Sequence, residues 1–430
     1  MLLRSGKSDL ERLLDGIFEN GRELPIRVRG YDGTSLGPAD APFGVRITGP
    51  DALRHIVTAP GDLGLARAYL TGGLRLEGVH PGDPYPLFAA LKSAEAGRPR
   101  VRDVARLVGG LGPGLLQRPP LPRREAPARW KRALLTRLPA GARSRVVEAI
   151  RYHYDIGNDF FALVLGPSMT YSCAVFTPTD DDLQNAQRRK YALIADKLDL
   201  QPGQRLLDIG CGWGGMVRHA ARERGVRALG VTVSAQQADW AQRRIRDEGL
   251  GALAEVRLLD YRDVEEGQFD AICSIGMAEH VGSRRLAGYF RFLGDRLRTG
   301  GRLLNHCITR ADTRASAAPE PFTDRYVFPG GELVSMGRIV DHLDDSGLEV
   351  HHAENLRMHY GRTLAAWSGN LVGEWEAAVR AVGDETARVW GLYMAGARLG
   401  FEGDALHLSQ VLVGKPLRGG ATNWPLRSGW

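Results

Sequence analysis

Short apolar runs recur through the second half of the chain, and helix-like segments separate them. The run at residues 206–209 contains one aspartate and no helical period, which is typical of a strand buried in a mostly parallel sheet. Further apolar runs lie at residues 228–232, 254–259, 269–276 and 301–309. Helices are expected at residues 180–198, 216–224 and 283–297. This alternation predicts an α/β fold, with helices on both faces of a mostly parallel sheet.

Glycines follow the first apolar run, in the segment RLLDIGCGWGG at residues 205–215. Gly210, Gly212 and Gly214 can adopt positive φ and let a ligand approach bare backbone, and the segment satisfies the spacing G-x-G-x-x-G. Asp208 lies at the strand end, where a buried carboxylate requires hydrogen bonds or a cationic ligand group. From this segment alone, a tight turn without a ligand is an alternative. Polar residues at the ends of the next strands favour a ligand site, because open α/β sheets bind ligands there.

Length and composition predict two or three domains, since the chain has 430 residues, of which 43% are hydrophobic and 25% charged. Residues 1–95 predict a smaller N-terminal α+β domain. Its expected elements are helices at 9–19, 52–58 and 62–70 and strands at 25–30 and 44–47. Residues 96–147 predict a basic linker that contains proline, glycine and short helices such as 128–137. Residues 148–430 form the expected catalytic domain. For the first two regions, lipid association and a purely structural role are both open.

The net charge of +7 favours an anionic partner, such as a phospholipid surface or nucleic acid. The four cysteines form no C-x-x-C pair, which indicates reduced thiols in a cytosolic protein. No stretch approaches the apolar length of a membrane span, and the N-terminus lacks the apolar core of a secretory signal. We therefore expect a cytoplasmic protein whose membrane contact, at the inner face, is peripheral.

Two candidate residues near later strand ends have several interpretations. Glu279 and His280 follow the run at 269–276, but two adjacent ligands without a third at helical spacing do not favour zinc, and no metal is expected. Glu279 could instead cap the helix expected at 283–297. His306 lies inside the run at 301–309, where a lone histidine is more often a core residue than a catalyst.

Several motifs together resemble one enzyme family. The LDIGCGWGG segment resembles the S-adenosylmethionine loop of class I methyltransferases, which have a Rossmann-like sheet, and its Cys-Gly-Trp-Gly form is similar to the cyclopropane-fatty-acyl-phospholipid synthase and mycolic acid cyclopropane synthase family. More specific matches are YHYDIGNDFF at 152–161, MTYSCAVF at 169–176, MAEHVG at 277–282 and HYGRTLAAW at 359–367. The resemblance extends from about residue 63 to the C-terminus and is densest between residues 152 and 367.

The resemblance implies two sets of site residues. Contacts to S-adenosylmethionine are implied for Tyr171, Ser172, Asp208, Gly210, Gly212, Gly214, Thr232, Gln237, Tyr261 and Arg262. Many relatives have an acidic residue where Arg262 stands, so this chain departs from the family's pattern at that position. Ser234, between two members of the set, is also a candidate helix N-cap. In the family, bicarbonate held near the reacting carbon takes a proton, and the matching positions are Cys173, Glu279, His306, Ile308 and Tyr360.

We therefore expect a cyclopropane-fatty-acyl-phospholipid synthase that acts on unsaturated acyl chains of phospholipids at the membrane surface. One alternative keeps the same pocket but forms a methylene-branched or methyl-branched chain. Others are a non-catalytic lipid-binding relative and a methyltransferase for nucleic acid or a small polar acceptor. Intact pocket residues argue against the first of these, and the absence of an RNA-binding module argues weakly against the second, so no nucleic-acid partner is expected. The sequence is compatible with a homodimer.

Overall fold

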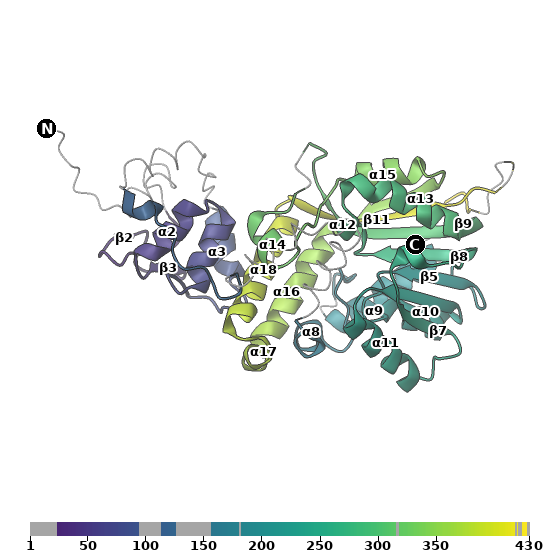
Figure 1. Ribbon diagram of the computed structural model, residues 1–430, viewed down its shortest axis with the longest axis horizontal. Helices are drawn as coiled ribbons and strands as arrows, with labels where there is room; N and C mark the ends of the chain where they lie inside the picture. Colours follow the sequence, from purple (N-terminus) through teal and green to yellow (C-terminus); the bar gives the residue numbers. More distant parts are fainter. Residues whose placement is uncertain are drawn as a thin grey trace. The chain divides into compact units, whose positions relative to one another are not determined.

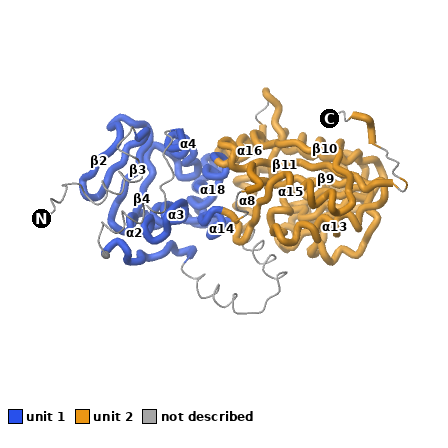
Figure 2. Tube along the Cα trace, turned by 90° about the horizontal axis from the view of Figure 1, so that it is seen from above, with its two compact units in different colours: residues 1–139, 320–327, 371–399 blue, residues 140–319, 328–370, 400–430 orange. Residues whose placement is uncertain are grey.

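The computed structural model describes residues 24–93, 113–125, 156–179, 182–314, 318–417, 419 and 424–427. It divides into two compact units, which Figure 2 shows in different colours. Unit 1 comprises Met1–Pro139, Glu320–Val327 and Leu371–Leu399, and unit 2 comprises Ala140–Pro319, Phe328–Asn370 and Gly400–Trp430. The helices predicted at 9–19 and 128–137, and most of the predicted linker, lie outside the described residues. The predicted domain boundaries stay predictions.

Unit 1 contains a small sheet in the order β2-β1-β3-β4, in which β1 pairs parallel with β3 and the other pairs are antiparallel. Its strands are β1 (Arg27–Arg29), β2 (Ser35–Leu36), β3 (Gly44–Ile47) and β4 (Leu74–Glu77). Its helices are α2 (Pro50–Thr58), α3 (Asp62–Leu70), α4 (Tyr85–Ser93), η2 (Pro113–Leu116), α14 (Pro321–Tyr326), α17 (Trp375–Val382) and most of α18 (Asp384–Glu402). The strands and helices predicted between residues 25 and 70 are confirmed.

A buried carboxylate ties separate segments of unit 1 together. Glu125, which is 3% exposed, receives two hydrogen bonds of 2.7 Å from the Arg67 guanidinium on α3. The Tyr326 hydroxyl on α14 donates to the same carboxylate at 2.5 Å. A buried charge is tolerated only when it is paired and hydrogen-bonded, as Glu125 is. This ion pair therefore explains how residues remote in sequence pack into one unit.

Unit 2 is built on a seven-stranded sheet in the order β10-β11-β9-β8-β5-β6-β7 (Figure 1). The strands are β5 (Arg205–Ile209), β6 (Arg227–Thr232), β7 (Ala254–Leu258), β8 (Phe269–Ile275), β9 (Leu297–Arg310), β10 (Glu349–Asn355) and β11 (Leu406–Gly414). The pairs from β7 to β9 are parallel, and β11 pairs antiparallel with both β9 and β10. The predicted mostly parallel sheet is confirmed. The chain reverses its direction of winding beside β5, and open α/β sheets bind ligands at such a switch point.

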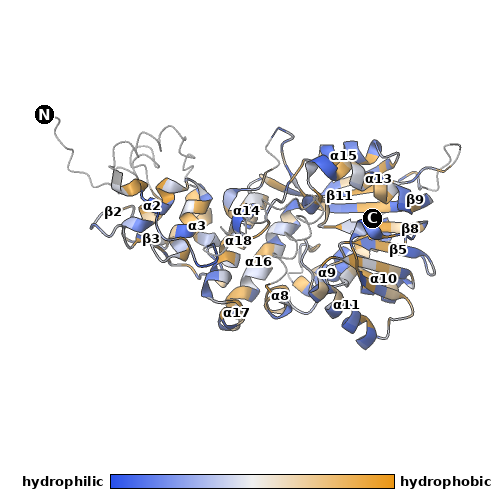
Figure 3. Cartoon of the chain, in the orientation of Figure 1, coloured by the Kyte–Doolittle hydropathy of each residue, from blue (hydrophilic) through white to orange (hydrophobic). Residues whose placement is uncertain are grey.

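Helices cover both faces of this sheet, as predicted. The helices of unit 2 are α8 (Asn158–Leu165), α9 (Leu183–Lys197), α10 (Gly215–Arg224), α11 (Ala235–Asp247), α12 (Ala278–Val281), α13 (Leu286–Arg296), α15 (Met336–Asp344) and most of α16 (Arg357–Gly373), with the short turns η3 (Tyr261–Asp263) and η4 (Ser283–Arg285). Leu206 packs in one core with residues of α9, α10 and α11, whereas Leu207 packs in a second core with residues of α13 and α15. Both leucines are fully buried, so β5 is apolar on both faces. Figure 3 shows that α11 is largely hydrophilic, and its buried residues are Gln237, Ala238, Ala241 and Ile245.

None of the helices in the described part of the chain combines the length and the apolar character that crossing a bilayer requires.

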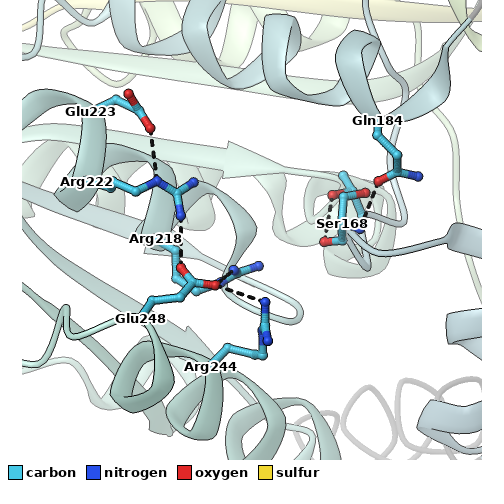
Figure 4. A network of polar contacts seen from close by, with 8 residues as sticks. Ser168, Gln184, Arg218, Arg222, Glu223, Arg244 and Glu248 are labelled. Atoms are coloured by element: carbon cyan, nitrogen blue, oxygen red, sulfur yellow. Dashed lines mark hydrogen bonds and ion pairs between the residues drawn. The ribbon is translucent and has the colours of Figure 1, made fainter.

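Two helices that matter for the site, α10 and α11, are joined by charged side chains (Figure 4). Glu248, which follows α11, pairs with Arg218 and with Arg222 of α10, the latter at 3.0 Å. Arg244 of α11 approaches the same carboxylate at 3.3 Å. This network therefore holds the last turn of α11 against α10.

Candidate active site

The glycine loop between β5 and α10 has the backbone that the sequence predicts. Gly210, Gly212 and Gly214 have φ values of 72°, 53° and 72°, a region that residues with a Cβ rarely adopt. Gly215, the first residue of α10, is needed for a different reason. A Cβ there would lie 2.1 Å from the hydroxyl oxygen of Tyr191 on α9. The loop therefore turns sharply and packs closely at the carboxyl end of β5.

Polar side chains at the neighbouring strand ends meet one another. Thr232, the last residue of β6, donates from Oγ1 to Gln237 Oε1 at 2.7 Å, and both residues are buried. Ser234 Oγ accepts the Gln237 N–H at 3.4 Å, so the predicted N-cap of α11 is confirmed. The structure thus brings Thr232 and Gln237 together at the sheet edge. Their contact with a cofactor stays a prediction.

Tyr261 and Arg262 lie in η3, after β7. The Arg262 guanidinium forms a two-pronged pair with Asp260, at 2.8 and 2.5 Å, and lies 5.5 Å from the centre of the Tyr261 ring. The Tyr261 ring packs edge-on against Tyr289, with centroids 5.1 Å apart. Arg262 is therefore held by its own neighbours. A contact between either residue and adenine stays a prediction.

The segment that precedes Cys173 is held by α9. Ser172 Oγ accepts a hydrogen bond of 2.8 Å from Lys190 Nζ, and the Ser172 carbonyl accepts one of 2.9 Å from Gln187 Nε2. One turn earlier on α9, Gln184 Oε1 accepts the Ser168 N–H at 2.9 Å (Figure 4). Tyr171 stacks on Trp367 of α16, with ring centroids 5.2 Å apart. These contacts fix both predicted cofactor residues of this segment.

Lys190 of α9 is a fully buried lysine that the sequence did not single out as a site residue. Burial lowers the pKa of Lys190 to about 7, against the opposing effect of the Cys173 thiol and the Asp208 carboxyl group. Burial likewise raises the pKa of Asp208 to about 6, although the Cys273 thiol donates to it at 3.3 Å and Lys190 favours its charged form. A signal existed in the sequence. The polar residues Gln187, Lys190 and Lys197 share the helical stripe of Leu183 and Ile194.

Glu279 lies in α12, directly after β8, and its two carboxylate oxygens have different surroundings. Oε1 accepts the Ile308 N–H of β9 at 2.7 Å. Oε2 is buried and makes no hydrogen bond with any described residue. Burial raises the pKa of Glu279 to about 7, although the Ile308 N–H favours the charged form. Glu279 does not cap the next helical turn, because Glu332 accepts the Ser283 N–H there at 2.6 Å.

His306 lies on β9, two residues before Ile308, and is 1% exposed. Its Nδ1 lies 3.0 Å from Nε2 of Gln410 on β11. Its Nε2 is buried and has no partner among the residues that the structure describes. Burial, followed by the charges of Lys190 and Lys197, lowers the pKa of His306 well below its usual value, so the ring is neutral. His306 is therefore a buried histidine with one open nitrogen.

Contacts connect the remaining predicted catalytic positions to this region. Cys173 Sγ lies 4.0 Å from the Leu356 carbonyl, and burial raises the pKa of its thiol. The Leu356 N–H in turn donates to the carbonyl of Leu408, which lies opposite Ile308 in the sheet. Tyr360, in the first turns of α16, packs on Phe401 and edge-on against Trp367, with centroids 4.4 and 6.1 Å away. All five predicted positions thus belong to one continuous set of packed segments.

A family model for mycolic acid cyclopropane synthetase matches residues 142–411 of this chain. The chain belongs to this family. Over its full length it is 49% identical to the full length of a probable fatty acid methyltransferase of Mycobacterium tuberculosis. It is 31% identical over 380 residues to cyclopropane-fatty-acyl-phospholipid synthase of Escherichia coli K12, covering 88% of this chain and 90% of that protein.

A solved member of the cyclopropane synthase family has the same fold as unit 2. The mycolic acid cyclopropane synthase CmaA1, in complex with SAH and CTAB, aligns with a TM-score of 0.59 and 31% identity over 63% of this chain and 98% of that chain. The predicted class I methyltransferase fold is therefore confirmed. The roles of the individual site residues stay predictions, which are based on the family resemblance and on the contacts that these residues make.

Proposed function

We propose that this chain is a cyclopropane-fatty-acyl-phospholipid synthase, which uses S-adenosylmethionine to convert a cis double bond of a membrane-lipid acyl chain into a cyclopropane ring. Membership of the cyclopropane synthetase family supports the coarser assignment of a lipid methyltransferase. The observation that supports methylation of an alkene with loss of a proton is that two buried polar atoms, Glu279 Oε2 and His306 Nε2, have no partner among the described residues; they lie where the pairing of β8 with β9 ends. Simple methyl transfer to a nucleophile needs no such pair, whereas ring closure needs a base.

The switch point of the sheet fits S-adenosylmethionine. The positive-φ loop at Gly210–Gly214 exposes backbone, and Asp208, Thr232 and Gln237 supply polar groups around it. Tyr171 and Ser172 are fixed beside the same region by Trp367 and Lys190. When bound, the cofactor supplies an electrophilic methyl group on a sulfonium centre. The protein then has to orient the double bond and exclude water.

The buried pocket residues fit bicarbonate. Near neutral pH, Glu279 is partly protonated because its pKa is raised to about 7, so Oε2 can donate a hydrogen bond to an anion. A neutral imidazole can donate from Nε2 in the same way. The family resemblance assigns Cys173, Ile308 and Tyr360 to the same ligand. Bicarbonate held by these residues supplies the base that accepts the proton lost on ring closure.

Aromatic side chains suit the positive charge that an alkene acquires when it is methylated. Rings of Tyr171, Trp367 and Tyr360 pack in series, with neighbouring centroids 5.2 and 6.1 Å apart. Aromatic faces attract cations and offer no nucleophile that would capture them. The same rings exclude water from the reacting carbon. The protein thus contributes orientation and electrostatics.

A second outcome would use the same pocket and is supported by a relative. If the cation loses a different proton after a hydride shift, the product is a methylene-branched or methyl-branched chain. The 49% identical relative named as a probable fatty acid methyltransferase favours this alternative. A non-catalytic lipid-binding role is disfavoured, because its pocket would not need to keep buried polar groups that are costly when unpaired.

The substrate places the enzyme at a membrane surface. We propose peripheral attachment at the cytoplasmic face, supported by the net charge of +7. Binding to vesicles that contain anionic phospholipid should weaken as salt is raised from low to physiological concentration and above, because exposed charges are screened. Salt-independent binding would contradict an electrostatic attachment. A homodimer stays a proposal that sedimentation can test.

Product analysis tests the proposed function directly. The enzyme is incubated with S-adenosylmethionine, bicarbonate and vesicles of a monounsaturated phospholipid, and the acyl chains are analysed by mass spectrometry. We expect a gain of one CH2 and, by NMR, ring protons without a vinylidene or branched methyl signal. A methylene or branched methyl signal would select the second outcome. No gain on any unsaturated lipid would reject both.

A further inference from the structure

Four side chains from four elements form a line that ends at His306. Glu354 of β10 pairs with Lys197 Nζ at the end of α9. Lys197 Nζ also donates to Gln410 Oε1 at 2.7 Å, and Gln410 Nε2 lies 3.0 Å from His306 Nδ1. The sheet register explains this line, because Gln410 on the middle strand β11 lies directly opposite both Glu354 and His306. We refer to Glu354, Lys197, Gln410 and His306 as the relay.

The order of donors and acceptors in the relay follows from its charged end. A lysine ammonium group can only donate, so the Gln410 atom that faces Lys197 is the carbonyl oxygen. The amide NH2 of Gln410 must then face His306, and Nδ1 of the imidazole must accept. A neutral imidazole that accepts at Nδ1 carries its proton on Nε2. The relay therefore selects one of the two neutral tautomers of His306.

The burial of the relay makes this selection strong. Lys197 is fully buried, and Gln410 and His306 are each 1% exposed, so water cannot replace a lost partner. Glu354, 31% exposed, supports the charged form of Lys197 against the lowering effect of burial on its pKa. A turned Gln410 amide would place its NH2 against the ammonium group. That arrangement would leave buried donors facing each other, which is costly.

We propose that Lys197 and Gln410 are positioning residues that hold His306 as the neutral Nε2–H tautomer, so that the open side of the ring presents a hydrogen-bond donor to an anion. This inference rests on the proposed function, because the donor is needed only if an oxyanion such as bicarbonate occupies the pocket. The opposite tautomer would turn a lone pair toward that anion. A purely structural relay would instead stabilise the fold without any effect on the tautomer or on the anion.

The tautomer of His306 can be tested without any enzymatic reaction, by nitrogen-15 NMR of the full chain with labelled histidine side chains. The protein has 11 histidines, so the spectrum of His306→Asn identifies the signal of His306 by its loss. In the wild type at pH 7.5 we expect a protonated Nε2 and an unprotonated Nδ1. Gln410→Met removes the donor to Nδ1 without a change of charge, and Lys197→Met frees the Gln410 amide to turn. Each should produce a population with Nδ1 protonated.

Titration with carbon-13 bicarbonate measures the consequence. Because only the Nε2–H tautomer donates, the affinity of Gln410→Met for bicarbonate should fall in proportion to the lost population, by about tenfold if one ring in ten keeps that tautomer. Ser409→Ala is the matched control, because it removes a buried 2.8 Å hydrogen bond to Thr309 between the same strands, one residue from Gln410. It should lower stability and leave tautomer and affinity unchanged.

Three results would overturn the inference: a protonated Nδ1 in the wild type, wild-type His306 signals in both Gln410→Met and Lys197→Met, or unchanged bicarbonate affinity in Gln410→Met. The proposed function fails separately. If the wild type shows the expected tautomer and binds bicarbonate but adds no CH2 to any unsaturated lipid, the relay stands as described and the assigned reaction is wrong.

Discussion

Glu279 accepts the backbone N–H of Ile308 at 2.7 Å, and this bond leaves the second carboxylate oxygen buried without a partner among the described residues. The last residue pair between β8 and β9 is Ile275 with His306. Ile308 lies two residues beyond it on β9, so Glu279 supplies the acceptor for its N–H in place of a strand residue. A side chain from the short helix after β8 therefore continues the hydrogen bonding of β9. The open oxygen, rather than the bonded one, is available for chemistry.

Substituting Glu279 by Gln should abolish ring formation while leaving cofactor binding intact. The amide can still accept from Ile308, but it cannot exchange a proton with a bound anion. We expect a loss of at least about a hundredfold in kcat, the usual scale for a group in proton transfer, with an unchanged dissociation constant for S-adenosylhomocysteine by calorimetry. Turnover at the wild-type rate would contradict the pocket role, and lost cofactor binding would indicate a folding defect.

The raised pKa of Glu279 also predicts a pH-dependent cost in stability. Between pH 4.5, the ordinary pKa of a glutamate, and about pH 7, the folded protein binds more protons at Glu279 than the unfolded chain does. The contribution of Glu279 to the free energy of unfolding therefore falls as pH rises through that window. At pH 8, Glu279→Gln should therefore be more stable than the wild type by up to about 3 kcal/mol. Urea unfolding at pH 5 and pH 8 measures the difference, which should be small at pH 5.

Glu332 is a control, because its pKa is shifted in the direction opposite to that of Glu279. Its hydrogen bonds with Ser283 lower its pKa, so its contribution is present above pH 4.5 and lost as pH falls below that value. Glu332→Gln should therefore be less stable than the wild type at pH 8. If the free energies of unfolding of Glu279→Gln and Glu332→Gln change equally with pH, neither pKa shift governs stability.

The sequence predicts the framework of unit 2 because its signals are local. The apolar runs of β5, β6, β8 and β9 appear without a helical period, and glycine spacing marks the loop after β5. Residues that belong to recognisable motifs, such as Glu279 and Tyr360, are found with them. Ser234 is predicted as a cap because capping depends on one residue and its near neighbours.

Residues whose role depends on meeting a distant element escape such reasoning. Gln410 faces His306 only through the register of β11 on β9, 104 positions away, and nothing in HLSQVLVG indicates which of its polar residues does so. Lys190 and Lys197 carried a weaker signal, since a lysine on an apolar helical stripe requires a partner. The grouping of Leu371–Leu399 with unit 1 is likewise a product of packing rather than of local sequence.

Lys190→Met should weaken cofactor binding. Ser172 loses its 2.8 Å donor, and the pKa of Asp208 rises further because burial is no longer opposed by a cation. Calorimetry with S-adenosylhomocysteine should show weaker binding.

Lys415→Met is the matched control for Lys190. Lys415 donates to the carbonyls of Gly294 and Leu297 at 2.8 Å, near the end of α13, and makes no contact with the cofactor loop. It should lose stability but keep the wild-type affinity for S-adenosylhomocysteine. If both variants bind equally well, Lys190 has a structural role only.

Gly230→Ala should damage the glycine loop from the neighbouring strand. A Cβ on Gly230 of β6 would lie 2.7 Å from Val217 Cγ2 and 2.8 Å from Cys211 Sγ, so α10 or the loop must move. Overpacking of this kind costs about 1–3 kcal/mol, and displacement of Cys211 should also weaken binding of S-adenosylhomocysteine. Gly251→Ala is the control, because no atom lies within 4 Å of its added Cβ.

Adding Cys211→Ala to Gly230→Ala makes room for the methyl group and should recover part of the affinity. If the double variant binds no better than Gly230→Ala, the loop is not displaced through Cys211, and pressure on Val217 at the start of α10 accounts for the loss.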